Sequence, residues 1–197
     1  MEKNHNSKSG FLALDGSPYQ LGRSVGESGA TVLRRRTRHL KRQLKANHIP
    51  ERVADARVRD FIKHVRKVAR HWLDEARGLA EGSGVRVEDI LRINCPPPGI
   101  STGALESCTS FISIGRSENW LFKIRDERYN TQCFYIDGSM NGTRVQSAKD
   151  IGNLGTAHFF NGSALAGACD TGSPTDLVTD EPRLNDCHLM RLIAESC

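Results

Sequence analysis

The sequence has no apolar leader and no long hydrophobic run. Its first ten residues, MEKNHNSKSG, are polar, and no stretch approaches the roughly 18 apolar residues that a membrane-spanning helix requires. We therefore expect a soluble, cytoplasmic protein with no membrane partner.

The cysteines and histidines show no metal-binding spacing. The six cysteines include no Cys-x-x-Cys pair, and the seven histidines form no cluster with ligand spacing. Cys187 and His188 are adjacent, and adjacent side chains on a helix point apart. Scattered cysteines without a secretory signal are typical of reduced thiols rather than of disulfides or a zinc site. We expect no metal and no cofactor.

Charge divides the 197 residues into two parts. Residues 1–107 hold 20 Lys and Arg against 12 Asp and Glu, whereas residues 108–197 hold 8 against 11. The total length and the 38% hydrophobic content suit one domain or two small ones. The uneven charge predicts two parts with different roles.

The first part has helical periodicity. After an expected strand at 10–14, Ser17 and Pro18 are a good N-cap and first helical residue. Apolar spacing predicts helices over about 19–46, 51–81 and 87–93, the second ending at Gly82-Ser83-Gly84. Gly22, Gly26 and Gly29 lie on one side of the first helix, which predicts close packing against another element.

The second part changes to a period of two. Strands are expected at 109–114, 120–125, 132–137, 143–147, 156–160 and 164–169, with hairpin loops at 115–119 and 137–142. A last helix is expected from residue 181. The fold class is therefore α+β.

Cys108 stands at the junction, within the stretch ESCTSF of residues 106–111. If the bond between Ser107 and Cys108 is cut, Cys108 gains an α-amine with an ordinary pKa of about 7.7 to 8.0, which can act as its base. One residue then supplies both nucleophile and base. The alternative is a buried structural cysteine at the start of a strand.

Several motifs in order resemble one family. They are GFLALDGSPYQLGRSVGE, ARGLAEGSGVRVEDILRIN, ESCTSF, FKIRDERYNTQ and NLGTAHFFN. Together they resemble the penicillin acyltransferase-like family of cysteine peptidases, the acyl-coenzyme A:6-aminopenicillanic acid acyltransferase group. The resemblance implies an N-terminal-nucleophile hydrolase with a helical pro-segment (1–107) and the start of an αββα catalytic domain (108–197).

The resemblance also implies roles for individual residues. Cys108 matches the nucleophile, and the precursor is cleaved between Ser107 and Cys108. Asp126 matches an aspartate that holds the nucleophile's amine, and Arg125 matches the arginine beside it. Asn161 matches an amide that binds substrate. The implied substrate is a small-molecule amide or acyl-CoA, whose acyl group passes through a cysteine thioester.

The sequence departs from the family pattern in places. Ile124 stands where an asparagine is expected, and Asp170 stands where relatives often carry an asparagine. A carboxylate cannot donate to an oxyanion as an amide does. Family members also continue well beyond the last helix, so the chain resembles a C-terminally truncated member. A half sandwich exposes a sheet face and its edges, which predicts poor solubility or a homo-oligomer.

Two other functions stay open. The first alternative is an inactive truncated homologue. The second is a basic helical module that binds nucleic acid through the run 34–42, RRRTRHLKR. The basic residues go round the helix without interleaved aromatics, which is more typical of a solvated face. We therefore expect no nucleic-acid partner.

Overall fold

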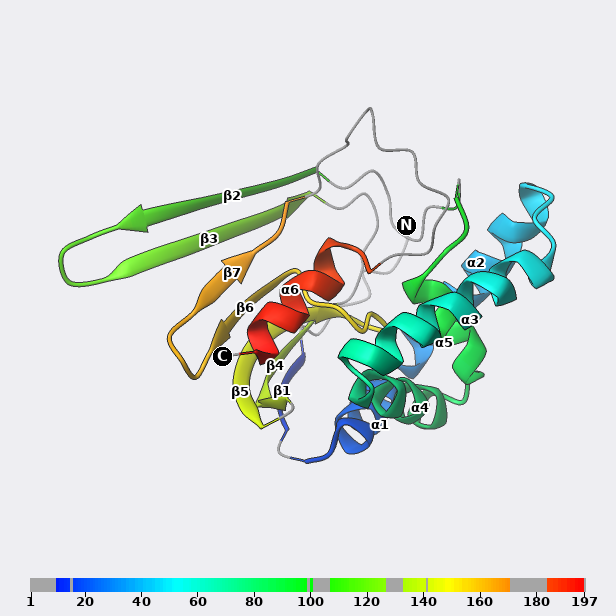
Figure 1. Ribbon diagram of the computed structural model, residues 1–197, viewed down its shortest axis with the longest axis horizontal. Coiled ribbons are helices and arrows are strands. Elements are labelled where there is room, and N and C mark those ends of the chain that lie inside the picture. The colour runs from blue at the N-terminus through cyan, green and yellow to red at the C-terminus, as the bar shows by residue number, and fades with distance from the viewer. Residues whose placement is uncertain are drawn as a thin grey trace, which may run out of the picture.

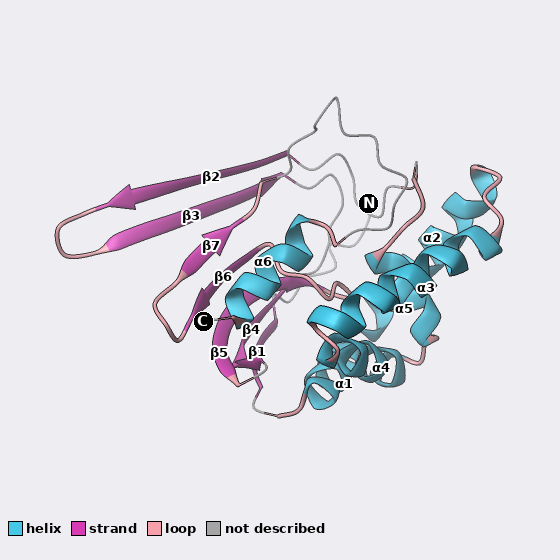
Figure 2. Ribbon diagram, in the orientation of Figure 1, coloured by secondary structure: helices cyan, strands magenta, loops and turns pink. Residues whose placement is uncertain are grey.

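The computed structural model describes residues 10–14, 16–98, 100, 107–126, 133–140, 142–170 and 184–196. Within these ranges the chain forms six helices and seven strands, the strands being arranged in two sheets. A bundle of five helices lies beside the larger sheet, and a two-stranded hairpin projects away from both (Figure 1; Figure 2). The predicted α+β class is confirmed. The αββα sandwich stays a prediction.

The helices lie in two groups. α1 (Pro18–Ser28), α2 (Ala30–Ala46), α3 (Glu51–Val68), α4 (His71–Ser83) and α5 (Val87–Asn94) form the bundle, and α6 (Asp186–Glu195) packs on the sheet. Ser17 caps α1 through the backbone amide of Gln20, with Pro18 at the first helical position, as predicted. Gly84 ends α4 in the left-handed conformation with φ 68°. None of the helices in the described ranges is long and apolar enough to cross a bilayer.

Both long predicted helices are interrupted, so their predicted continuity is wrong. The first ends at Ser28, and α2 begins again after Gly29. The second ends at Val68, where Ala69 takes an extended φ of −155°. Ala69 and Trp72, on either side of Arg70 and His71, are both buried in the core. Tertiary packing overrides a helical pattern that continues through the break.

The larger sheet has the strand order β1-β4-β5-β6-β7. Its strands are β1 (Gly10–Leu14), β4 (Cys133–Met140), β5 (Thr143–Asp150), β6 (His158–Asn161) and β7 (Ala166–Ala168). β1 pairs in parallel with β4, and the other neighbours are antiparallel. The N-terminal strand therefore shares a sheet with strands that follow Cys108.

Two predicted boundaries need correction. Asp137 and Gly138 belong to β4 rather than to a loop, because the strand continues to Met140 and pairs with β5 throughout. α6 begins at Asp186 after its N-cap Asn185, later than residue 181, and residues 181–183 lie outside the described ranges. In that N-cap the Asn185 side chain accepts from the backbone of His188 at 2.9 Å.

Helices α1 and α4 pack closely through glycine, as Gly22 and Gly26 predicted. A Cβ on Gly22 would lie 2.1 Å from the carbonyl oxygen of Glu75, and one on Gly78 would lie 2.1 Å from that of Tyr19. A Cβ on Gly26 would lie 2.6 Å from the carbonyl oxygen of Leu79, and one on Gly82 would lie 2.2 Å from that of Arg23. Four glycines therefore let the two helix backbones approach each other.

A buried ion-pair network joins the bundle to the sheet. Glu75 on α4 contacts Lys149 of β5 and Arg191 of α6, each at 2.6 Å. Arg191 also pairs with Glu195 at 2.7 Å and lies over the ring of Trp72. The main apolar core likewise contains residues from the bundle, the sheet and α6. A division at residue 108 stays a prediction, but the two parts share one core.

Candidate active site

Cys108 lies on the hairpin formed by β2 (Ser107–Ile114) and β3 (Asn119–Asp126). The antiparallel register places Cys108 opposite Arg125 and Ser110 opposite Lys123. Because side chains on a strand alternate between faces, Cys108, Ser110 and Lys123 share one face. We call Cys108, Ser110, Lys123 and Asp170 the cysteine cluster.

Lys123 is at the centre of the cysteine cluster. Its ammonium donates to Asp170 Oδ1 at 2.5 Å and to the backbone carbonyl of Cys169. Ser110 Oγ donates to the same Asp170 oxygen at 2.9 Å. Only 4% of the Lys123 side chain is exposed, so these bonds hold the ammonium largely out of water.

These contacts keep Lys123 protonated and Asp170 ionised. Burial lowers the pKa of Lys123, but its hydrogen bonds to Asp170 and Cys108 raise it more, and the net pKa is higher than usual. The pKa of Asp170 is lowered, first because Lys123 donates to it and also because Ser110 does. At neutral pH the cluster therefore contains an ammonium and a carboxylate beside the Cys108 thiol.

The predicted cleavage and orienting residues lie next to Cys108 in the backbone. Ser107 precedes it on β2, Arg125 is its register partner, and Asp126 is the partner of Ser107. The side chains of Ser107, Arg125 and Asp126 lie outside the described part of the structure. Their roles stay predictions, although the ladder brings the backbone of all three to the cysteine.

Asn161 has a well-defined structural use. It is buried at the end of β6, where its side-chain oxygen accepts from the amides of Ser163 and Leu165 at 3.1 and 3.0 Å. Its side-chain nitrogen donates to the carbonyl of Ala194 on α6 at 3.2 Å. These bonds shape the turn after β6 and attach α6. A role for Asn161 in substrate binding stays a prediction.

Sequence reasoning missed Ser110 and Lys123. A signal existed: Ser110 follows Cys108 by two residues, which places both on one strand face. Lys123 lies between the apolar residues Phe122 and Ile124, so strand alternation places it on the face opposite to theirs. The pairing register, which the sequence does not specify, brings these residues together.

The opposite face of the hairpin is apolar and exposed. Phe111 stacks on Phe122 with ring centroids 4.4 Å apart, and Trp120 lies 6.2 Å from Phe122. These three side chains and Ile124 are each more than two-fifths exposed. The sequence predicted an exposed sheet face, and the exposed apolar face that the structure shows belongs to the hairpin β2–β3.

Part of the basic helical run has a structural role. Arg34 donates to the carbonyl of Ser83 at 2.9 Å, and Arg36 donates to the carbonyl of Ile151. Lys41 pairs with Asp89 at 2.9 Å. These three cations connect α2 to its neighbours, and the nucleic-acid alternative stays open.

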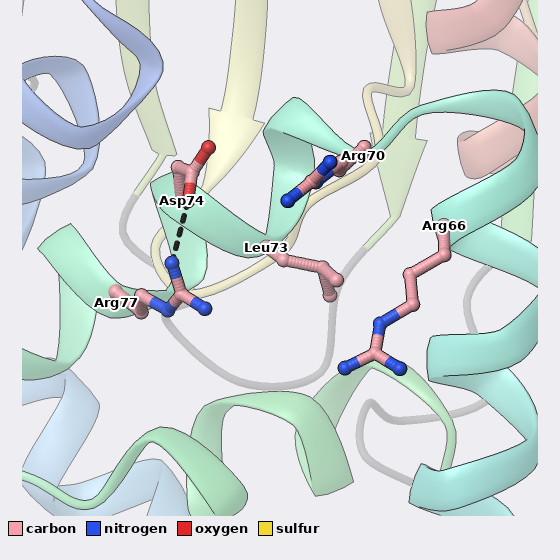
Figure 3. Close-up of a pocket in the computed structure, with 5 residues that line it drawn as sticks. All are labelled: Arg66, Arg70, Leu73, Asp74 and Arg77. Carbon is pink, nitrogen blue, oxygen red and sulfur yellow. Dashed lines mark hydrogen bonds and ion pairs between the residues drawn. The ribbon is translucent and has the colours of Figure 1, made fainter.

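A basic pocket lies elsewhere on the bundle. Its volume is about 440 Å³, and it is lined by Arg66, Arg70, Leu73, Asp74 and Arg77. Figure 3 shows Arg66 and Arg77 on either side of Leu73, with Arg77 paired to Asp74 at 2.8 Å. The lining has three guanidinium groups against one carboxylate, which suits an anion. It includes no member of the cysteine cluster.

The sequence was also compared with known proteins. No protein-family model matches it, and no curated protein matches it.

Proposed function

We propose that the protein is a cysteine N-terminal-nucleophile hydrolase or acyltransferase that activates itself by cleavage before Cys108. The observation that supports this proposal is the placement of Cys108 on the strand face that also holds Ser110, Lys123 and the Asp170 carboxylate. The motif resemblance to the penicillin acyltransferase-like family supports the same assignment.

The self-cleavage has two steps. The Cys108 sulfur attacks the Ser107 carbonyl carbon, the Ser107–Cys108 C–N bond breaks, and the α-amine of Cys108 takes the thiol proton. Water then hydrolyses the thioester, which leaves a carboxylate on Ser107 and a free thiol on Cys108. The new amine can serve as general base in later turnovers.

The catalytic reaction repeats this chemistry on a substrate. The thiol attacks an amide or thioester carbonyl, the acyl group becomes a Cys108 thioester, and the amine or thiol of the substrate leaves. Water or an amine then takes the acyl group. The Lys123 ammonium stabilises the negative charge that develops during the attack, and Asp170 and Ser110 hold that ammonium in place.

Acyl transfer to Cys108 can be tested by mass spectrometry. Protein incubated with an activated ester such as p-nitrophenyl acetate should gain one acyl group, and peptide mapping should place it on Cys108. Cys133→Ser is the matched control, because Cys133 is a partly buried cysteine on another strand, β4, and this variant should acylate normally. Equal acylation of Cys108→Ala, or mapping to another cysteine, would contradict the proposal.

The pocket of three arginines favours a second candidate, a site for a phosphate-bearing ligand on the helical bundle. It is independent of the cysteine cluster. We rank it second because the pocket's arginines are exposed and several cations of the nearby basic run are used within the fold.

A further inference from the structure

Two cysteines outside the cysteine cluster lie side by side, although they are far apart in the sequence. Cys169 follows β7, and Cys187 is in the first turn of α6. Their sulfur atoms are 3.8 Å apart. One carboxylate oxygen of Asp186 completes a group of three potential ligand atoms, all within 4.8 Å of one another.

Both cysteines are held by the same short segment. The amide of Cys169 donates to the carbonyl of Ala157, and the amide of Thr156 donates to the carbonyl of Cys187, each at 2.9 Å. Gly155 packs directly on Cys187, because a Cβ there would lie 2.6 Å from the Cys187 carbonyl carbon. These contacts hold the backbone of both cysteines in place.

The sulfur separation suits a shared metal ion better than a disulfide. Two thiolates at about 2.3 Å from a tetrahedral Zn²⁺ lie about 3.8 Å apart. A disulfide needs about 2.05 Å, so the sulfurs would have to approach by about 1.8 Å. The observed 3.8 Å requires no movement for the ion.

We propose that Cys169, Cys187 and Asp186 bind one Zn²⁺ ion, with water in the fourth position. Thiolate ligands select zinc over magnesium or calcium. The two cysteines are partly buried and Asp186 is exposed, so an ion can enter from solvent. The nearby Lys123 ammonium is offset by its pairing with Asp170 at 2.5 Å. The ion would tie the end of β7 to the start of α6.

Cobalt is a direct probe of this site. Full-length protein, kept reduced with a phosphine, is titrated with Co²⁺, and we expect a sulfur-to-cobalt charge-transfer absorption that saturates at one ion per chain and is bleached by Zn²⁺. Cys169→Ser and Cys187→Ser should lose the absorption, and Asp186→Asn should need more cobalt. Cys133→Ser, which changes a cysteine elsewhere, should behave as wild type.

A second readout needs no variant. Zn²⁺ should protect two thiols from maleimide, and peptide mapping should identify them as Cys169 and Cys187. No charge-transfer absorption in wild type, or the same absorption in a folded Cys169→Ser protein, would overturn the proposal. So would protection of other cysteines, or a Cys169–Cys187 disulfide that forms while zinc fails to bind.

Discussion

Gly78→Ala tests the close packing of α1 against α4. The new methyl carbon would lie 2.1 Å from the carbonyl oxygen of Tyr19 and 2.7 Å from the amide nitrogen of Arg23. Ordinary contact begins at 3.4 Å, so the helices would have to separate by about 1.3 Å, the difference between 3.4 and 2.1. Both obstacles are backbone atoms, which cannot rotate away as a side chain can.

The size of the effect follows from two opposing terms. Overpacking costs up to about 3 kcal/mol, while replacing glycine by alanine inside a helix gains about 1 kcal/mol. The difference between these terms is a net loss of about 2 kcal/mol in the free energy of unfolding. Helix α4 also carries Glu75 of the buried ion-pair network. For a chain of this length the melting temperature should fall by about 4 to 8 °C.

Urea unfolding followed by circular dichroism measures this loss, and Gly162→Ala is the matched control. A Cβ at Gly162 meets nothing nearer than 3.7 Å, so that variant should stay within about 0.5 kcal/mol of wild type. If Gly78→Ala is as stable as the control, α1 and α4 are not packed as described.

Three further predictions concern the core, the cysteine cluster and the basic pocket. Burial, together with the charges of Arg191 and Lys149, lowers the pKa of His188 to about 3. Below about pH 6.5 the unfolded chain therefore binds more protons than the folded chain. The free energy of unfolding should fall by about 2 kcal/mol when the pH is lowered from 7 to 5. His188→Phe should lack this part of the pH dependence, and an unchanged slope in that variant would contradict the assignment. Lys123→Met should slow self-cleavage at least about tenfold, because one charge contact is lost. The cleavage rate of Lys123→Arg should lie between those of Lys123→Met and wild type. If gel electrophoresis shows equal cleavage rates, Lys123 has no part in the mechanism. A mobility-shift titration of duplex DNA should show only weak binding. If DNA binding instead weakens steeply with salt, and is lost in an Arg66→Ala, Arg70→Ala double variant, the basic pocket binds phosphate.

Local signals in the sequence were sufficient for much of the fold. Ser17 and Pro18 marked the start of α1, and the left-handed Gly84 marked the end of α4, because caps depend on neighbouring residues only. The change from helical to alternating periodicity located the hairpin that carries Cys108. Gly22 and Gly26 correctly predicted close packing, although the partner helix could not be known.

Features that depend on tertiary contacts were not visible. The break at Ala69 interrupts a stretch whose apolar spacing is helical throughout, and both Ala69 and Trp72 are buried there. Glu75 and Arg191 look like surface charges in the sequence, yet they are buried because each supplies the other's counter-charge.

The candidate site shows the same division. Cys108 was proposed from its local motif, whereas the position of Lys123 depends on strand register and on Asp170, which follows β7. The proximity of Cys169 to Cys187 likewise results from the packing of α6 on the sheet. Spacing rules for metal sites consider short segments, so they do not detect such a pair.

The intact mass of freshly expressed protein beside Cys108→Ala tests the central proposal most directly. We expect wild type to separate into two fragments that meet between Ser107 and Cys108, while Cys108→Ala stays at the full 21.8 kDa. If folded wild-type protein also stays at 21.8 kDa, Cys108 does not cleave the chain, and the proposed self-activation is wrong.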